Sequence, residues 1–151
     1  MIVIVPAEIE HIHWIMQHVR PEDRDELWAA ARATPQECMR YGIVMGRESW
    51  TGLVDGNPIV MCGVTSPSIM SDEGSPWLVA TNDLEKHGLE FLKLSRRMAR
   101  IWFGRYTSLQ NWVDIRNEKA VQWLQWLGFE MEEPAPFGPF AMPFRRFHRG
   151  M

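Results

Sequence analysis

Hydrophobic residues recur at helical spacing near the N-terminus. They lie within residues 6–20 and predict an amphipathic helix that follows a short strand at the start of the chain. Two more helices are predicted after it, because Pro21 and the acidic residues behind it suit a helix start, and Thr34 and Glu37 have the spacing of a capping box. The residues expected to face inward from the first helix are Ile9, Ile12, Met16 and Val19. The first third is therefore predicted to be helical apart from its opening strand.

The pattern changes to short β-prone runs in the second third of the chain. Two of these runs lie within residues 49–70 and surround a hairpin turn signal, Asp-Gly-Asn-Pro, at residues 55–58. A third run covers residues 75–83 and is bounded by Pro76 and Asp83. Because consecutive short runs joined by turns pair with their neighbours, they predict an antiparallel meander of three strands.

A long amphipathic helix is predicted over residues 83–106, with Gly104 expected to end it. A strand follows over residues 108–117, and Asn117 then caps a short helix that stops at Gly128 and Phe129. Four prolines divide the tail, so any strand in it is expected to be interrupted or to lie at an edge. The residues expected to face inward from the two helices are Leu84, Phe91, Leu94, Met98, Ile101, Ala120, Leu124 and Leu127.

Size, charge and cysteine content narrow the classes of function. The 151 residues fit one domain, expected over residues 1–151, with one continuous core. No apolar run is long enough for a membrane span, and a formal net charge of -3 gives no general attraction to nucleic acid. Cys38 and Cys62 lie on segments expected to be buried and lack the spacing of a zinc site. We therefore expect a reducing compartment and no metal site.

The order of the predicted elements is strand, helices, three-strand meander, long helix, strand, short helix and terminal strands. With Asn117, Ala120, Leu124 and the Gly128-Phe129 stop, this order resembles the GNAT superfamily of acyl-CoA N-acyltransferases over nearly the whole chain. The resemblance implies an α/β fold of three layers, in which helices flank a mixed, mostly antiparallel, twisted sheet. It also implies acetyl-CoA or another acyl-CoA as cofactor, with the thioester held where the fourth and fifth strands splay.

The resemblance places the cofactor pyrophosphate on backbone amides at the start of the long helix, where the helix dipole attracts an anion. The family pattern is Gln or Arg, two residues, Gly, one residue, then Gly or Ala, whereas residues 85–90 here read Glu-Lys-His-Gly-Leu-Glu. One glycine is kept, and the two glutamates repel pyrophosphate unless they turn away, so the cradle resembles a degraded one. The cofactor-binding residues implied are Val79, Thr81, His87, Gly88, Leu89 and Asn117.

The sequence offers few catalytic residues. Many active GNAT enzymes carry a tyrosine seven residues after the asparagine, where it protonates the departing thiolate, but Leu124 holds that position here. A hydrocarbon side chain cannot act as a general acid. Asp83, just past the fourth strand, is the carboxylate nearest to where the family often keeps a general base, and it is also well placed to cap the helix beginning at Leu84. Asp83 is therefore one candidate, and the other catalytic residues stay unassigned.

A narrower resemblance covers residues of about 50 to 132. The pattern Trp77-x-Val79-x-Thr81-x-Asp83, the Arg-rich long helix and the Trp-Val strand after it are similar to the GNAT-like internal virion protein A group of short-tailed bacteriophages. That group is associated with particle assembly and also lacks a clear cofactor motif. The resemblance implies phage structural proteins as partners, and the host cytoplasm, with incorporation in a virion, as the location.

Three functional hypotheses follow. The first is a phage-encoded GNAT-fold protein with a degraded acetyl-CoA site, which serves virion assembly without robust acetyltransferase activity. The second is a working acyl-CoA-dependent N-acyltransferase that transfers acetyl to an amine and has an atypical pyrophosphate loop. The third is nucleic-acid binding through residues 144–149, Phe-Arg-Arg-Phe-His-Arg, although a terminal strand with an exposed basic edge explains these residues better in an acidic protein. Acetyl-CoA binding separates the first two.

Overall fold

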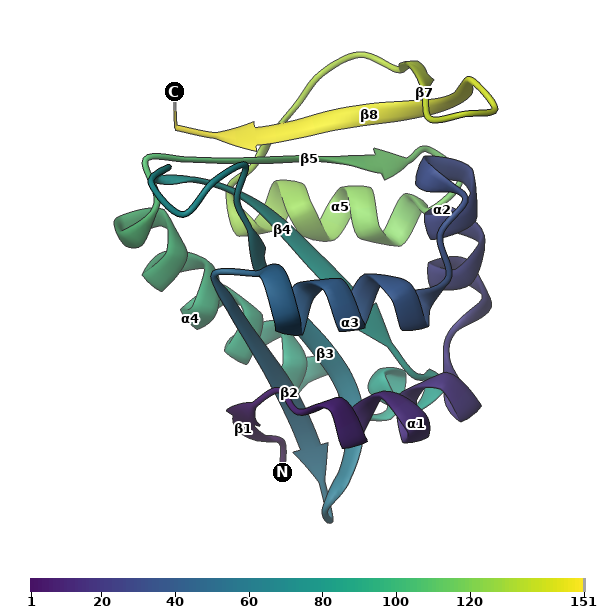
Figure 1. Cartoon of the computed structure of the whole chain (residues 1–151), viewed down its shortest axis with the longest axis vertical. Coiled ribbons are helices and arrows are strands. Elements are labelled where there is room, and N and C mark those ends of the chain that lie inside the picture. Colours follow the sequence, from purple (N-terminus) through teal and green to yellow (C-terminus); the bar gives the residue numbers. More distant parts are fainter. Residues whose placement is uncertain (151) are drawn as a thin grey trace.

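Helices and strands follow one another in the predicted order along residues 1–150, the part that the computed structural model describes (Figure 1). The helices are α1 (Ile9–His18), α2 (Pro21–Ala31), α3 (Pro35–Met45), α4 (Gly88–Arg105) and α5 (Glu118–Leu127), with a 3-10 helix, η1 (Asn82–His87), before α4. The strands are β1 (Val3–Pro6), β2 (Glu48–Val54), β3 (Asn57–Thr65), β4 (Glu73–Ala80), β5 (Ser108–Asp114), β6 (Glu130–Met131), β7 (Ala135–Phe137) and β8 (Met142–Arg149). The long helix thus has a separate 3-10 beginning that the sequence did not predict.

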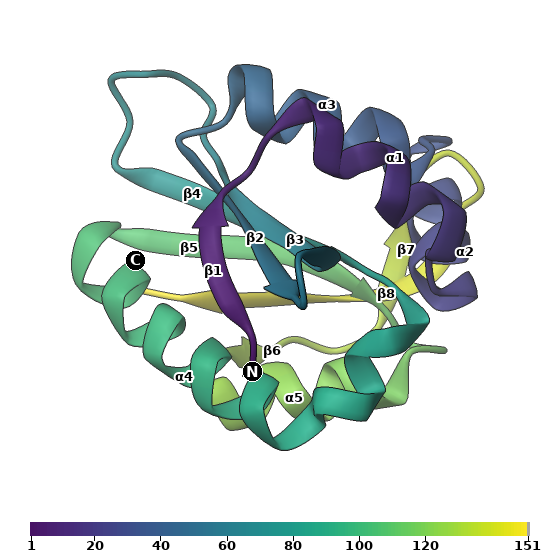
Figure 2. The same cartoon turned by 90° about the horizontal axis from the view of Figure 1, so that it is seen from below.

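The eight strands form one sheet in the order β1-β2-β3-β4-β5-β8-β6, with β7 paired to β8. Every pairing is antiparallel except that of β4 with β5, which is parallel. Helices α1, α2 and α3 cover one face of the sheet, and α4 and α5 cover the other (Figure 2). The predicted fold, three layers around a mostly antiparallel mixed sheet, is therefore confirmed.

Core side chains fill both faces of the sheet. The cluster shared with α4 and α5 includes Trp102, Leu109, Val113, Leu124, Phe129 and Phe147. The cluster shared with α1 and α3 includes Ile12, Ile15, Val19, Met39, Met61 and Val79. Two inward assignments were wrong, because Ile9 is 41% exposed and Ile101 is 50% exposed. The helices are turned slightly from the predicted phase, so that Ile15 and Trp102 are buried instead.

Several local signals in the sequence are confirmed. Thr34 and Glu37 form the predicted capping box, with each side chain bonded to the other residue's backbone N–H. Asp55 and Gly56 both have positive φ in the β2–β3 turn, and Gly128, with φ of 114°, ends α5 in the left-handed region. Gly104, however, does not end α4, which continues to Arg105. A glycine in right-handed geometry supplies no stop signal.

The tail is interrupted, as predicted, into the separate strands β6, β7 and β8, but β8 itself lies inside the sheet, between β5 and β6. Its proline is tolerated because Pro143 is near the start of the strand, where β7 pairs with it. The arginines of residues 144–149 bond to neighbouring elements. Arg145 Nε donates to Glu132 C=O at 2.7 Å, and the Arg149 guanidinium lies 4.3 Å from the centre of the Phe103 ring. These side chains thus contact neighbouring segments of the molecule, and nucleic-acid binding stays a prediction.

Membrane-spanning helices, metal-binding groups and the two cysteines were each considered in the sequence, and the structure bears on all three. Among residues 1–150, no helix is both long and apolar enough to cross a membrane. Within the same residues, no three His, Cys, Asp or Glu side chains gather in a group that could hold a metal ion. Cys38 and Cys62 are free thiols, and burial raises the pKa of each to about 12. Both thiols therefore stay protonated at neutral pH.

Candidate functional site

The strands β4 and β5 pair over a short length and then separate. Their parallel register joins Glu73 to Ser108 and Gly74 to Leu109, and the later part of β5 pairs with β8 instead. Just beyond the paired end, Asn111 Nδ2 donates to the Pro76 carbonyl at 2.8 Å and bridges the two strands. Figure 1 shows the resulting V between β4 and β5, which widens toward α2. We call this space the β4–β5 gap.

The register of β4 decides which backbone groups line the gap. Thr81 faces β3, because its N–H and its hydroxyl both donate to the Ile59 carbonyl, at 2.9 and 3.0 Å. Ala80 faces the gap, where its carbonyl accepts from Arg20 N–H at 2.9 Å. Alternation along the ladder then directs the N–H and C=O of Leu78 into the gap.

The predicted cofactor-binding residues Val79 and Thr81 are thus fully buried, with their backbone groups directed toward β3. A shift of one residue along a strand exchanges the two edges, so Leu78 and Ala80 are the β4 residues with backbone groups in the β4–β5 gap. Sequence reasoning missed both, because nothing in the sequence fixes the phase of β4 relative to β3.

The turn between α1 and α2 covers the far end of the β4 edge. Val19 forms an antiparallel bridge with Thr81, and the buried carboxylate of Asp23 accepts from Ala80 N–H at 2.7 Å. Arg20 donates to both oxygens of that carboxylate, at 3.2 and 2.8 Å. Burial nevertheless raises the pKa of Asp23 above its ordinary value, although Arg20 opposes the shift. The ion pair and the β4 amide together fix α2 at the mouth of the gap.

One turn further along α2, Glu26 reaches the opposite strand. Its Oε1 accepts from the backbone N–H of Asp114, in β5, at 2.9 Å. The Asp114 carboxylate is itself paired with Arg116, at 2.5 Å. Burial raises the pKa of Glu26 to about 7; the charges of Asp23 and Asp114 add to that shift, while the Asp114 N–H and Arg20 oppose it. Glu26 is therefore a carboxyl that exchanges its proton near neutral pH.

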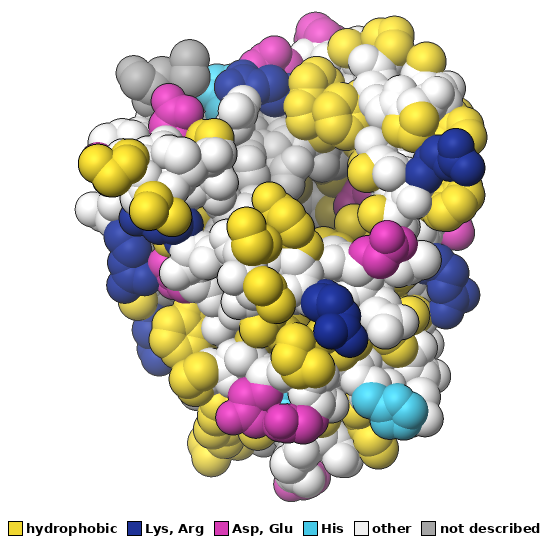
Figure 3. Space-filling model, in the orientation of Figure 1, with side chains coloured by type: hydrophobic (Ala, Val, Ile, Leu, Met, Phe, Trp, Pro, Cys, Tyr) yellow, Lys and Arg dark blue, Asp and Glu magenta, His cyan; other side chains and the backbone are white. Residues whose placement is uncertain are grey.

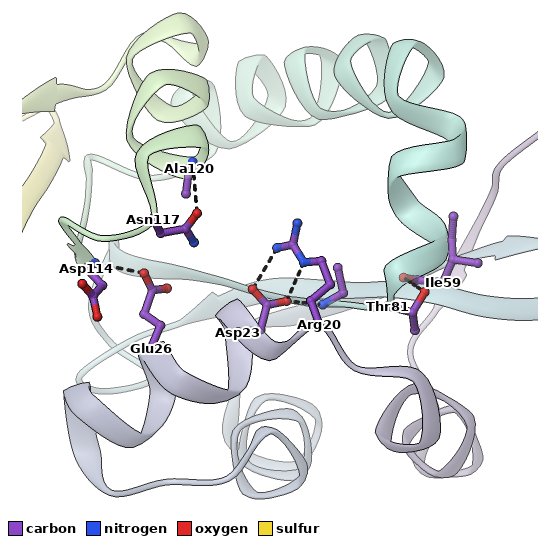
Figure 4. Close-up of polar contacts among 9 residues, drawn as sticks. Arg20, Asp23, Glu26, Ile59, Thr81, Asp114, Asn117 and Ala120 are labelled. Carbon is purple, nitrogen blue, oxygen red and sulfur yellow. Dashed lines mark hydrogen bonds and ion pairs between the residues drawn. The ribbon is translucent and has the colours of Figure 1, made fainter.

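These side chains surround one space. Figure 4 shows Arg20, Asp23 and Glu26 of the α1–α2 region on one side of it and Asn117, at the start of α5, on the other. Figure 3 shows the surface hollowed between α3 and β5, over the β4–β5 gap, with hydrophobic and acidic side chains at the floor. The gap is thus reached from the face that α2 and α3 cover.

Sequence reasoning also missed Glu26. The acidic start of α2 was interpreted as a partner for the helix dipole, which accounts for Glu22 and Asp23 in the first turn and assigns no role to Glu26 in the second. The i, i+3 spacing of Asp23 and Glu26 is the signal that could have found them, because it places both side chains on the face that also carries Ala30. Only the packing of α2 against the sheet shows that this face turns toward the gap.

The start of α4 is open. His87 is the N-cap without a side-chain cap bond, Leu89 is 79% exposed, and a Cβ placed on Gly88 meets no atom within 4 Å. The two glutamates of the predicted cradle have other partners. Glu90 accepts from Ile2 N–H at 2.6 Å, and Oε1 of Glu85 lies 3.9 Å from Nζ of Lys119. The residues at this helix start therefore fit an anionic group, since the surroundings of Gly88 and Leu89 are open and each acid has a positive or N–H partner.

Asp83, the candidate base, lies in η1 and pairs with Lys86 at 3.1 Å. Its expected capping role was wrong, because the helical segment begins earlier and Thr81 is the N-cap of η1. Asn117 does cap α5, as predicted, by accepting from Ala120 N–H at 3.4 Å. A catalytic role for Asp83 and cofactor binding by Asn117, His87, Gly88 and Leu89 stay predictions.

The position that carries an acid in many active GNAT enzymes contributes to packing in this protein. Leu124 is buried in the core cluster under α5. Tyr106 is tied elsewhere, because its hydroxyl donates to Glu48 at 2.5 Å, and burial together with that bond raises its pKa. Tyr41 is exposed on α3. The Tyr106 hydroxyl is therefore held by Glu48 at the C-terminal end of α4.

Comparisons with solved structures identify the fold. The acetyltransferase of the GNAT family from Streptococcus pneumoniae superposes with a TM-score of 0.69 at 16% identity, covering 100% of both chains. The spermidine N-acetyltransferase from Vibrio cholerae, in complex with CoA and spermine, superposes with a TM-score of 0.70 at 13% identity, covering 98% of this chain and 94% of that one. The chain has the GNAT fold.

Identities this low establish the fold alone, so the acyl transfer named for these proteins is a property of those proteins. No family model matches the sequence, and no curated protein matches it either. The predicted GNAT architecture is therefore confirmed, while the narrower resemblance to phage internal virion proteins stays a prediction.

Proposed function

We propose that the protein is an acyl-CoA-dependent N-acyltransferase that transfers an acyl group to a primary amine. The observation that carries this proposal is the separation of β4 from β5 beyond Gly74 and Leu109, which leaves the backbone groups of Leu78 directed into the β4–β5 gap. A structural neighbour that binds CoA and spermine in its own structure adds support from the same fold.

The residues present fit an acyl-CoA at both ends of its expected path. The open start of α4, at Gly88 and Leu89, suits the pyrophosphate, with His87 beside it. Leu78 offers an N–H and a C=O on the open edge of β4, and Asn117 borders the same gap. The coenzyme supplies the activated thioester carbonyl. This chain supplies the groups that orient the thioester and a carboxyl that takes up a proton.

A pair of glycines in one helix tests coenzyme binding. Gly88 and Gly104 lie near opposite ends of α4, and a Cβ on either meets no atom within 4 Å, so both accept a side chain without a clash. Gly88→Glu is expected to weaken acetyl-CoA binding by about 10-fold or more, since it puts a negative charge on the proposed phosphate site. Gly104→Glu is expected to leave the affinity within about twofold, because it lies at the other end of the helix.

Isothermal titration calorimetry with acetyl-CoA measures both affinities. The companion assay follows thiol release from acetyl-CoA with spermine, n-butylamine and phenethylamine as acceptors. The proposal fails if wild-type protein neither binds acetyl-CoA at millimolar concentration nor acetylates any of these amines. Equal weakening by the two glutamates would also reject the helix start as the phosphate site.

A protein of phage assembly is the second candidate, which the narrower sequence resemblance predicts. The observation in its favour is an apolar surface on α3 and the β3–β4 loop, at the centre and left of Figure 3. Its exposed residues are Tyr41, Val44, Met45, Ile69 and Met70. Exposed apolar patches of this kind mark protein contacts. Copurification of the chain with phage particles through a density gradient supports this candidate, and its absence from such particles rejects it.

A further inference from the structure

We propose that Glu26 is the general base of the reaction, an inference that rests on the proposed function. The geometry is specific: one carboxylate oxygen is fixed by the β5 backbone at 2.9 Å, and the side chain extends from α2 toward Asp114 and the start of α5 (Figure 4). A peptide N–H is a rigid anchor, so Oε1 holds the side chain in place. Oε2 is then the oxygen that can take a proton from a ligand.

The charges around Glu26 distinguish it from its neighbours. Asp23 is bonded through both oxygens to Arg20, and Asp114 is paired with Arg116. Each of these aspartates therefore has an arginine of its own. Glu26 has a backbone donor and no arginine bonded to its carboxylate among residues 1–150. An arriving ammonium group supplies the missing positive charge, so the site favours a cationic amine over a neutral alcohol.

The proton affinity of Glu26 agrees with this role. Burial raises its pKa to about 7, and Asp23 and Asp114 act in the same direction, whereas Arg20 opposes them. A carboxylate of ordinary pKa binds a proton too weakly to remove it from an ammonium group. A carboxyl group that stays protonated at the working pH cannot accept a proton at all. A carboxyl near pH 7 does both in one cycle.

Acyl transfer from the thioester to the ammonium group uses two protons of the substrate nitrogen. Oε2 of ionised Glu26 takes one proton from the substrate ammonium, and the freed nitrogen pair forms a C–N bond to the acyl carbon. The C–S bond breaks, and its electron pair leaves on sulfur. The second nitrogen proton passes to that sulfur to give the thiol, and Glu26 returns its own proton to solvent. One amide, one thiol and one released proton result from one ammonium and one thioester.

Glu26→Gln tests the role with little change in shape, because the amide oxygen can still accept from Asp114 N–H. With the best acceptor of the three amines, kcat is expected to fall on the order of 10²- to 10⁴-fold, and KM for acetyl-CoA to change by less than about twofold. The acidic limb of the wild-type rate profile near pH 7 should disappear. Asp25→Asn, at an exposed carboxylate of the same helix, is the matched control and should keep wild-type rates.

Stability separates a chemical role from a structural one. The folded pKa of Glu26 lies above the ordinary value of 4.5, so the wild type loses stability as pH rises from 4.5 to about 7. Glu26→Gln lacks this loss and should melt roughly 10 °C higher than wild type at pH 8. In wild-type protein, n-butylammonium chloride should shift the side-chain carboxyl ¹³C resonance of Glu26, a readout that needs no turnover.

The outcomes are distinct. Unchanged kcat and pH profile in Glu26→Gln overturn the role of Glu26 while the proposed function stands. Lost activity together with a lower melting temperature at pH 8 assigns Glu26 a structural role and also overturns it. A wild type that acetylates none of the three amines overturns the proposed function, and the role of Glu26 with it.

Discussion

Replacing Asp23 by Ala is expected to lower the free energy of unfolding by about 3–5 kcal/mol. The substitution removes a buried carboxylate and leaves two groups without their partner: the Arg20 guanidinium and the backbone N–H of Ala80 on the edge of β4. Breaking one side of a buried ion pair costs far more than the pair contributes, because the remaining charge stays desolvated. Urea unfolding followed by tryptophan fluorescence measures the change.

Two further variants show where the energy comes from. Asp25→Ala removes an exposed carboxylate from the same helix and should change stability by less than about 0.5 kcal/mol. Asp23→Asn keeps an acceptor for Ala80 N–H but loses the charge, so it should fall between the other two. If Asp23→Ala destabilises no more than Asp25→Ala, the anchoring of α2 on β4 is wrong.

Replacing Glu48 by Gln is expected to cost about 2–3 kcal/mol. At the start of β2, its Oε1 accepts from the indole N–H groups of Trp50 and Trp102, at 2.9 Å each. Its Oε2 accepts from Arg105 at 2.6 Å and from the Tyr106 hydroxyl at 2.5 Å. An amide keeps one acceptor oxygen and turns an NH₂ group toward the other pair of donors. That pair then loses its acceptor at the C-terminal end of α4.

The same variant should change the response to acid. Burial acts to raise the pKa of Glu48, but the hydrogen bonds outweigh it and lower the pKa from its ordinary value of 4.5. A depressed folded pKa adds stability above pH 4.5, and this increment is lost as pH falls toward the folded value. Chemical denaturation between pH 3 and 7 should therefore show a steeper acid loss in wild type than in Glu48→Gln. Glu133→Gln, at an exposed site, should follow wild type; parallel curves for all three would contradict the assignment.

The sequence predicted the elements whose signals are local. The capping box of α3, the Asn117 cap and the left-handed stop at Gly128 depend on neighbours within a few residues, and the structure has all three. The interior position of β8 depends on partners far away in the chain. The prolines predicted an interrupted strand or an edge strand; the tail is interrupted, but Pro143 lies near the start of β8, so that its missing N–H does not exclude β8 from the interior of the sheet.

The candidate site was less predictable, because it depends on the register of each strand with its neighbours and on which face of α2 packs against the sheet. Which backbone groups of β4 face the gap depends on its register with β3, and a shift of one residue exchanges Val79 for Leu78. The proton affinity of Glu26 depends on burial and on charges supplied by β5 and by the start of α2. From the sequence, Glu85 and Glu90 were expected to repel the pyrophosphate. Only the structure shows that Glu90 turns to accept a hydrogen bond from Ile2 N–H.

The amide spectrum of ¹⁵N-labelled protein during a titration with CoA tests the central claim most directly. If the β4–β5 gap and the start of α4 bind the coenzyme, the largest chemical-shift changes should belong to the amides of Leu78 and Leu89. These changes should level off as the CoA concentration rises and the site fills. Shifts confined to the surface pocket of about 340 Å³ lined by Gly128, Glu130, His148, Arg149 and Gly150, or no shifts at millimolar CoA, would contradict the proposed site.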